Sequence, residues 1–274
     1  MELNGKIAIV TGSARGIGEG IAMVLAREGA KLVIADLSLE DAQRVVRKIE
    51  AGGGQAIAAR TDVSRKADVD AMVATAVAAF GRVDVLVNNA GIESRPCLIE
   101  DLAEDQWDRV LGVNLKGVFL CCQAVVPQMR KQGEGRIVNI GSTASLRMTF
   151  FGGVEYTVSK HGVGGLTQHL AWELADSRIT VNTVCPGGVQ TPLMDATTTA
   201  EYRDMTVKRL IPLGRFTGMD EIGETVSFLA SHRAATITGQ MLAVDGGLLT
   251  GFGEDLRAVV RSRMEAMKSE GKHG

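Results

Sequence analysis

The chain carries the segment Thr11-Gly12-Ser13-Ala14-Arg15-Gly16-Ile17-Gly18 directly after a short apolar run and directly before a stretch of helical periodicity. Glycines in such a loop allow the backbone to turn sharply and to approach a pyrophosphate closely. The N-terminus of the following helix offers free N–H groups and a partial positive charge to the same group. A tight turn alone would also favour glycine, so the rest of the chain must decide between these two interpretations.

Short runs rich in valine and isoleucine alternate with longer segments of helical periodicity along the chain. The runs predict strands at residues 7–10, 31–35, 55–60, 83–87, 135–140, 180–184 and 240–244, and helices are expected at 17–28, 39–51, 67–80, 103–131, 155–175 and 220–230. The strands are apolar throughout instead of alternating, which is typical of a parallel sheet covered on both faces. We therefore expect an α/β fold: a three-layer, Rossmann-like, doubly wound parallel sheet in a single domain.

The composition limits the classes of partner. The 274 residues carry a formal net charge of −2, which gives no electrostatic reason to expect nucleic acid or a membrane as a partner. No uninterrupted apolar run approaches the roughly 20 residues that span a bilayer, and no signal peptide is visible, so a cytoplasmic location is expected. The four cysteines lack the spacing of metal ligands, so no metal site is expected, and Cys121 and Cys122 are interpreted as buried free thiols.

An acidic residue, Asp36, closes the second predicted strand, and its carboxylate is expected to accept hydrogen bonds from an adenosine ribose. The same carboxylate would repel a 2′-phosphate, which favours NAD over NADP. Arg15 points the other way, because a guanidinium near the adenosine could pair with a phosphate. No basic residue follows Asp36 directly, since the next residues are Leu37 and Ser38. NAD is therefore the expected cofactor, with NADP as the alternative.

The spacing of the glycines, Gly-x-x-x-Gly-x-Gly, is joined by further motifs in a fixed order along the chain. Together they resemble the single-domain branch of the short-chain dehydrogenase/reductase family, over roughly residues 5–250. The motifs that carry the resemblance are Asn88-Asn89-Ala90-Gly91, Asn114, Ser142, Tyr156 with Lys160, and Pro186-Gly187. The resemblance implies an NAD(P)-dependent oxidoreductase that acts on CH–OH or C=O groups of a small-molecule alcohol or ketone.

The resemblance also implies which residues contact the cofactor, from the adenine at one end to the nicotinamide at the other. The matching positions are Gly12, Arg15, Gly16, Ile17, Gly18, Asp36, Leu37, Asp62, Val63, Asn89, Ala90, Gly91, Tyr156, Lys160, Pro186, Gly187, Val189 and Thr191. Asn88 is interpreted as structural, because its family role is to fasten the fourth strand to its neighbours.

Tyr156 and Lys160 stand four positions apart at the start of a predicted helix, so their side chains share one face. Hydride transfer needs a group that gives a proton to oxygen in one direction and removes it in the other. A cation about 4 Å away would be worth roughly 4 kcal/mol and would lower a tyrosine pKa by about three units. Ser142, at the end of the fifth strand, is expected to hold the substrate oxygen. By resemblance, Asn114 bends the long helix and holds a water that links Lys160 to solvent.

The pocket for the substrate is expected beside these residues. Its lining is predicted to be Glu93, Thr143, Phe150, Phe151, Gly188, Leu193 and Met194, with Arg95, Arg147 and Glu155 as further polar candidates. The long connection at about residues 188–217 predicts a flap over this pocket. Residues 1–251 are expected to form the dinucleotide-binding catalytic domain, and 252–274 a helical extension with an amphipathic helix at 254–268.

Two other functions remain open at this stage. A 3-oxoacyl-acyl-carrier-protein reductase uses the same fold and catalytic set, but it would prefer NADPH and would need a basic docking patch. Arg130, Lys131 and Arg178 are the candidates for that patch. A catalytically silent nucleotide sensor or scaffold is disfavoured because tyrosine, lysine and serine are all present. By resemblance the assembly is expected to be a homotetramer, with a dimer as the alternative.

Overall fold

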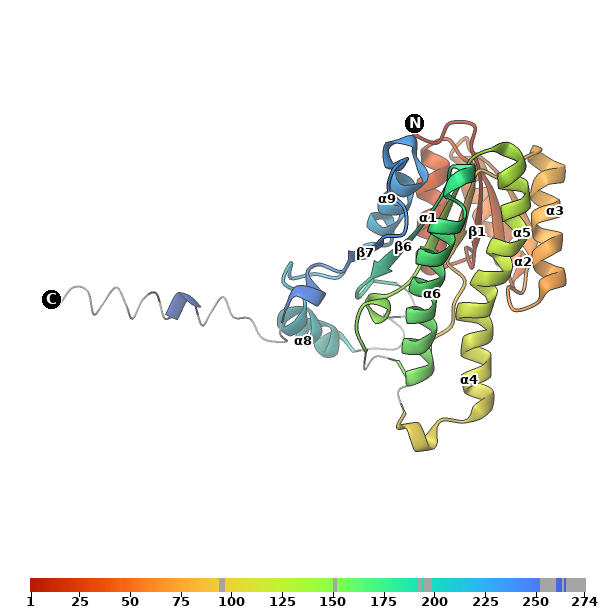
Figure 1. Ribbon diagram of the computed structural model, residues 1–274. Coiled ribbons are helices and arrows are strands. Elements are labelled where there is room, and N and C mark those ends of the chain that lie inside the picture. The colour runs from red at the N-terminus through yellow and green to blue at the C-terminus, as the bar shows by residue number, and fades with distance from the viewer. Residues whose placement is uncertain are drawn as a thin grey trace.

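The computed structural model describes residues 1–93, 97–149, 152–191, 194, 199–251, 260–262 and 264. The described residues form one sheet of seven parallel strands between two layers of helices (Figure 1). The strands are β1 (Ile7–Thr11), β2 (Lys31–Asp36), β3 (Gln55–Arg60), β4 (Val85–Asn88), β5 (Gly135–Ile140), β6 (Ile179–Pro186) and β7 (Met241–Val244). All seven predicted strands are confirmed, with ends that differ by a few residues.

The strand order is β3-β2-β1-β4-β5-β6-β7. Strands β2 and β3 therefore lie on one side of β1, and β4 to β7 lie on its other side. Strand β1 pairs with β2 and with β4, with Val10 opposite Val87 in the second pair. The direction of winding therefore reverses between β1 and β4, and open α/β sheets bind their ligands outside the carboxyl ends of the strands at that point.

Helices cover both faces of the sheet. They are α1 (Gly16–Arg27), α2 (Leu39–Ala51), α3 (Lys66–Phe80), α4 (Glu104–Leu111), α5 (Gly117–Gln132), α6 (Val154–Glu173), α8 (Ala200–Leu210) and α9 (Met219–Ala230). One core packs α1, α2 and α9 against the sheet, and the other packs α3, α5 and α6 (Figure 1). Ala8 and Val10 belong to the first core and Ile9 to the second. Strands β1, β4, β5 and β6 are buried along their whole length, as expected for a sheet covered on both faces, whereas β3 and β7 at the sheet edges are partly exposed. The prediction of strands that are apolar throughout is met only in part, because β5 and β6 also bury polar residues such as Asn139 and Asn182.

The long helix predicted at residues 103–131 is divided into α4 and α5 by a π-helical turn, η2 (Gly112–Lys116). Asn114 lies inside this turn, where the family resemblance placed a bend. By length and composition, residues 104–132 would also pass as a membrane span. Val118, Val125 and Met129 of this segment are nevertheless packed in the core against the sheet. Such packing is that of a core helix.

Two predictions at the carboxyl edge of the sheet are modified or lie outside the described residues. The connection predicted as a flap contains a helix, α8, and residues 192–193 and 195–198 within it lie outside the described part. Of the helix predicted at 254–268, only residues 260–262 and 264 are described, and all four are helical.

Candidate active site

The glycine loop between β1 and α1 is open toward the carboxyl edge of the sheet. Gly12 has a φ of +62°, and a Cβ there would lie 2.7 Å from the Cα of Ala90. Gly16 has a φ of +57°, and no described atom lies within 4 Å of the point where its Cβ would be. Arg15, the N-cap residue of α1, makes no side-chain cap within the described chain. The first N–H groups of α1 therefore fit a pyrophosphate.

Hydrogen bonds join this loop to the segment after β4. Asn89 donates from Nδ2 to the carbonyl oxygens of Thr11 and Gly12, at 3.0 and 2.9 Å. Thr11 Oγ1 accepts from the backbone N–H groups of Asn89 and Ala90, both at 3.1 Å. Thr11 was missed by the sequence reasoning, although it is a polar residue at the end of an apolar run. These bonds hold the two sides of the β1–β4 crevice at a fixed separation.

Asn88 has the structural contact that was expected of it. Its Nδ2 donates to Asn139 Oδ1 at 2.8 Å, and Asn139 Nδ2 donates to Thr167 Oγ1 at 2.9 Å. The chain of side chains therefore fastens β4 to β5 and β5 to α6. All three residues are buried, so each bond also satisfies groups that would be costly to leave unpaired.

The carboxyl ends of β2 and β3 hold the residues expected at the adenosine. Asp36 accepts from the N–H groups of Ala14 at 3.0 Å and Ser38 at 3.2 Å, which orients its carboxylate at the edge of the crevice. Asp62 accepts from Ser64, through the backbone N–H at 3.0 Å and the hydroxyl at 2.6 Å. The other residues predicted to contact the adenosine differ in exposure. Leu37 and Arg15 are exposed, whereas Val63 is buried against Gly117.

A cation near this end was missed by the sequence reasoning. Arg44 of α2 donates to the Ala14 carbonyl at 2.5 Å and pairs with Glu19 of α1 at 3.0 Å. Burial opposes ionisation of Glu19, but hydrogen bonds from Arg44 and Lys48 outweigh it and hold the pKa of that carboxyl below its usual value. Because the guanidinium is paired with a carboxylate, it is not a free phosphate-binding group.

Ser142, Tyr156 and Lys160 converge at the carboxyl end of β5. Ser142 caps the short helix η3 (Thr143–Ser145), with its Oγ accepting from the Ala144 N–H at 3.1 Å. Its hydroxyl lies near enough to the Tyr156 phenol to lower the pKa of that phenol. Lys160, one turn along α6, lies with Nζ 5.7 Å from the centre of the tyrosine ring. The structure thus brings the three predicted residues together.

The pKa values of this cluster differ from the expectation. Burial raises the pKa of Tyr156, the hydrogen bond with Ser142 opposes that rise, and the charge of Glu93 adds to it. Lys160 donates its Nζ proton to the Ile140 carbonyl at 2.9 Å instead of pointing at the phenol, and burial lowers its own pKa to about 8. The prediction that Lys160 lowers the tyrosine pKa is therefore wrong for this geometry.

Asn114 lies fully buried behind the cluster and makes three hydrogen bonds. Its Oδ1 accepts from the Ile92 N–H at 2.8 Å, and its Nδ2 donates to the Ile92 carbonyl at 3.0 Å and to Ser159 Oγ at 3.4 Å. Ser159 Oγ in turn donates to the Tyr156 carbonyl at 2.7 Å. The π-helical turn thereby connects the segment after β4 to the first turns of α6. The water expected at Asn114 remains a prediction.

The segment after β6 borders the same space. A Cβ at Gly187 would lie 2.8 Å from the Cα of Asp245, and one at Gly188 would lie 2.6 Å from the ring of Phe216, so both positions need glycine. Pro186 ends β6, and Val189 is buried and bridges to Thr217. Thr191 Oγ1 accepts from the Met194 N–H at 3.2 Å. These predicted nicotinamide contacts follow the carboxyl end of β6, the strand that pairs with β5, which Ser142 follows.

The predicted substrate lining remains a prediction, and the structure describes only some of its residues. Glu93 is exposed, and Thr143 and Met194 are half-buried, whereas Phe150, Phe151, Leu193 and Arg95 lie outside the described residues. Arg147 is exposed, and its Nη2 lies 3.4 Å from the Leu248 carbonyl oxygen. The prediction that Glu155 faces the pocket is wrong: its side chain is fully buried and accepts a hydrogen bond from Gln106.

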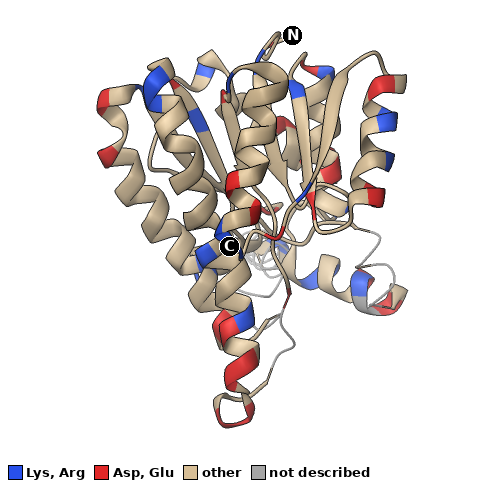
Figure 2. Ribbon diagram, turned by 90° about the vertical axis from the view of Figure 1, so that its right-hand side faces the viewer, with Lys and Arg blue, Asp and Glu red and all other residues tan. Residues whose placement is uncertain are grey.

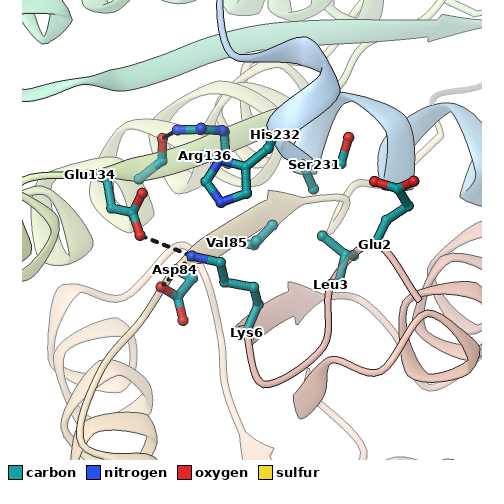
Figure 3. A pocket seen from close by; sticks show the side chains of 11 residues that line it. Glu2, Leu3, Lys6, Asp84, Val85, Glu134, Arg136, Ser231 and His232 are labelled. Carbon is teal, nitrogen blue, oxygen red and sulfur yellow. Dashed lines mark hydrogen bonds and ion pairs between the residues drawn. The ribbon is translucent and has the colours of Figure 1, made fainter.

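One small enclosed hollow lies at the opposite edge of the sheet (Figure 3). Lys6 bridges it, with Nζ 2.9 Å from Glu134 and 3.7 Å from Asp84, beside Arg136 and His232. Its volume of about 10 Å³ accommodates roughly one water molecule. Because it sits at the amino ends of β1, β4 and β5 and is filled by ion pairs, it is not a substrate site.

Comparison with known proteins gives the family. The profile of a family described as enoyl-(acyl carrier protein) reductase matches residues 12–249. A 3-oxoacyl-acyl-carrier-protein reductase of Thermotoga maritima is 40% identical over 249 residues, covering 91% of this chain and 100% of that protein. A cyclohexanol dehydrogenase of an Acinetobacter species is 39% identical over 249 residues, covering 89% of this chain and 95% of that protein.

A crystal structure of a Sinorhizobium meliloti protein described as a short-chain alcohol dehydrogenase superposes with a TM-score of 0.85 at 36% identity, covering 92% of this chain and 99% of that one. The chain belongs to the short-chain dehydrogenase/reductase family. It is an oxidoreductase that binds a nicotinamide cofactor and acts on CH–OH or C=O groups.

Proposed function

We propose that this protein interconverts a secondary alcohol and a ketone with NAD(H), and that Tyr156 is the general acid and base. The observation that carries the proposal is the convergence of Ser142, Tyr156 and Lys160 at the carboxyl end of β5, with Lys160 Nζ 5.7 Å from the centre of the tyrosine ring. A bound nicotinamide supplies or accepts the hydride. In reduction, Tyr156 gives its proton to the carbonyl oxygen while the Ser142 hydroxyl stabilises the developing charge. In oxidation, the phenolate removes the hydroxyl proton.

The surrounding residues have supporting roles in the proposal. Lys160 holds the cofactor ribose and stays beneath the phenol, and Asn114 keeps the first turns of α6 in register with the segment after β4. The glycine loop and the N-terminus of α1 bind the pyrophosphate, and Asp36 binds the adenosine ribose. Asp62 and Val63 border the adenine, and Pro186, Gly187, Val189 and Thr191 enclose the nicotinamide.

The substrate class is tested with a panel of cyclic, linear and aryl secondary alcohols and the matching ketones, followed by NADH absorbance. We expect turnover on a neutral, small to medium-sized substrate, because Leu146 and Met148 expose apolar surface beside Ser142. An absence of turnover across the panel with both cofactors would contradict the proposal.

Glu93 provides a test of the proton-transfer role through pH. Its negative charge raises the pKa of Tyr156, so Glu93→Gln is expected to lower that pKa. Alcohol oxidation needs the phenolate, and its kcat/KM should therefore rise to its plateau at a lower pH in the variant. The control is Glu100→Gln, another exposed acid. An unshifted profile for Glu93→Gln would contradict the assignment of Tyr156 as the titrating base.

The choice of NAD rests on Asp36, whose carboxylate is fixed at the adenosine end. Asp36→Asn keeps the size of the side chain but removes its charge, and hydrogen bonds to charged groups are worth about 1.5–3 kcal/mol. We expect the ratio of kcat/KM for NADH to that for NADPH to fall about 10- to 100-fold, corresponding to that energy. Asp41→Asn, on the adjoining turn of α2, is the control. A wild-type preference for NADPH would overturn the cofactor assignment.

The second candidate is an NADPH-dependent 3-oxoacyl-acyl-carrier-protein reductase, supported by the similarity to the Thermotoga maritima enzyme. Two of its three candidate docking cations are engaged within the chain: Arg130 pairs with Asp176 at 3.4 Å, and Arg178 donates to the Gly133 carbonyl at 2.9 Å, whereas Lys131 is exposed. Acidic residues also gather along η1 (Ile99–Asp101) and the start of α4 (Figure 2). A negatively charged carrier protein would be repelled there.

Activity on acyl thioesters with NADPH, exceeding that on alcohols with NAD, would favour this candidate.

We further propose a homotetramer in the cytoplasm, with residues 1–251 as the catalytic domain, 188–217 as its substrate flap and 252–274 as an extension. The exposure of two large apolar side chains supports contact between copies: Phe119 on α5 is 45% exposed and Trp172 on α6 is 83% exposed. Burial of such surface favours association. Light scattering would measure the mass.

A further inference from the structure

We propose that Glu155 is a positioning residue for Tyr156, held through Gln106 of α4. This inference rests on the proposed role of Tyr156. Glu155 precedes the tyrosine in the first turn of α6, and its side chain is fully buried. Gln106 donates from Nε2 to Glu155 Oε1 at 2.7 Å, across 49 positions of sequence. The bond therefore joins the start of α4 to the turn that carries the phenol.

Glycine at the start of α6 leaves room for this carboxylate. Gly153 is the N-cap residue, and a Cβ there would lie 2.8 Å from the carboxylate carbon of Glu155. The Glu155 side chain thus fills the space that a side chain at the cap would occupy. A negative charge in the first turn is favourable to the helix dipole, so the carboxylate also suits its position electrostatically.

Stability of the fold alone does not account for a carboxylate at this position. Among the described residues, Glu155 Oε2 has no hydrogen-bond partner although it is buried. An unsatisfied buried oxygen costs stability, and an apolar pair of similar shape would avoid that cost. A group retained in a position of this kind calls for an explanation such as a role in the site.

A second contact joins the same long helix to the catalytic turn. Asn114, two turns further along the same long helix, reaches Ser159 at 3.4 Å, and Ser159 donates to the Tyr156 carbonyl. Glu155 and Ser159 lie four positions apart on α6, so they share a face beside the face of Tyr156 and Lys160. The long helix from α4 to α5 therefore contacts the catalytic turn at both of its ends. The Gln106–Glu155 bond, at 2.7 Å, is shorter than the Asn114–Ser159 bond, at 3.4 Å, and it involves a carboxylate.

The test replaces both partners at once. In Gln106→Leu/Glu155→Leu the hydrogen bond is absent and no charge is left buried, so the thermal midpoint should not fall. Misplacement of a reacting group by about 1 Å can cost on the order of 100-fold, and we expect kcat to fall about 10- to 100-fold with the KM for NADH unchanged. Glu155→Gln keeps an oxygen that accepts from Gln106, so Tyr156 should stay in place. Its kcat should therefore stay within about threefold of the wild-type value. Gln168→Leu, exposed on α6, is the control.

A second readout does not depend on turnover. The chain has two tyrosines, so Tyr202→Phe leaves Tyr156 as the only one, and phenolate absorbance then reports its titration directly. The hydrogen bond with Ser142 lowers the pKa of Tyr156, and displacement of the phenol should weaken that bond. In this background the leucine pair should therefore titrate at higher pH than Glu155→Gln, which lacks the same carboxylate but keeps the bond to Gln106.

The outcomes separate this inference from the proposed function. Wild-type kcat in the leucine pair, with titration at the same pH as Glu155→Gln, would overturn the inference, as would an equal loss of kcat in Glu155→Gln. If the leucine pair does not fold, Gln106→Leu in the Glu155→Gln background removes the same bond and has the same expected and contrary results. Tyr156→Phe is measured alongside: if it keeps turnover, the proposed function fails, and the titration still decides whether Glu155 positions the phenol.

Discussion

Tyr156→Phe is expected to reduce turnover about 10³-fold in both directions, within the usual contribution of general acid–base catalysis. Phenylalanine keeps the ring that packs beside Gly152 but removes the hydroxyl whose pKa Ser142 lowers. The carbonyl oxygen of the substrate then has no acid to protonate it, and Ser142 alone can only stabilise the charge. The affinity for NADH, measured by fluorescence titration, should change by less than about twofold, or about 0.4 kcal/mol, because the glycine loop and Lys160, which are proposed to hold the cofactor, are unchanged.

The control for this variant is Thr75→Val, which removes an exposed hydroxyl on α3 and should keep wild-type kcat. A double variant with Ser142→Ala should lose little more than Tyr156→Phe, since residues that act as a unit are not additive. Turnover by Tyr156→Phe at a tenth or more of the wild-type rate would contradict the assignment. Loss of NADH binding together with turnover would indicate a damaged cofactor site instead.

The strands and most helices could be predicted because their signals are local. A continuously apolar run such as residues 32–35 indicates a strand buried on both faces. The sharp turn at Gly12 and Gly16 was predictable for the same reason. Glycine adopts a positive φ without steric cost, and both residues have one. The grouping of Ser142 with Tyr156 followed from the topology, because parallel strands and their following helices bring the carboxyl ends to one edge.

The partners of individual side chains could not be predicted in the same way. Helical spacing places Lys160 on the face of Tyr156, but it does not determine that the ammonium donates to the Ile140 carbonyl at 2.9 Å. Glu155 seemed a pocket residue because it precedes the tyrosine, whereas its real partner, Gln106, is brought to it by the packing of α4 on α6. Arg44 and Glu19 likewise come from different helices. Each of these contacts is determined by tertiary packing, which a local sequence pattern does not predict.

Gly18→Ala is expected to weaken NADH binding about 100-fold, the cost of misplacing binding groups by about 1 Å. Gly18 lies within α1, where alanine is the better helix former by about 1 kcal/mol. A Cβ at this position would nevertheless overlap the Gly12 carbonyl oxygen and the Asn89 side chain. The Gly12 turn and the bond from Asn89 would have to move, and with them the N–H groups that face the pyrophosphate.

Overpacking of this kind usually costs about 1–3 kcal/mol, so Gly18→Ala should also lower the free energy of unfolding despite its higher helix propensity. Gly165→Ala is the matched control, because Gly165 is an exposed residue of α6 with no described atom within 4 Å of its Cβ position. That variant should gain up to about 1 kcal/mol and bind NADH as wild type does. Calorimetric titration with NADH and thermal unfolding of both variants measure the two effects. If Gly18→Ala binds NADH normally, the glycine loop does not hold the pyrophosphate, because its backbone cannot accept the added methyl group without moving.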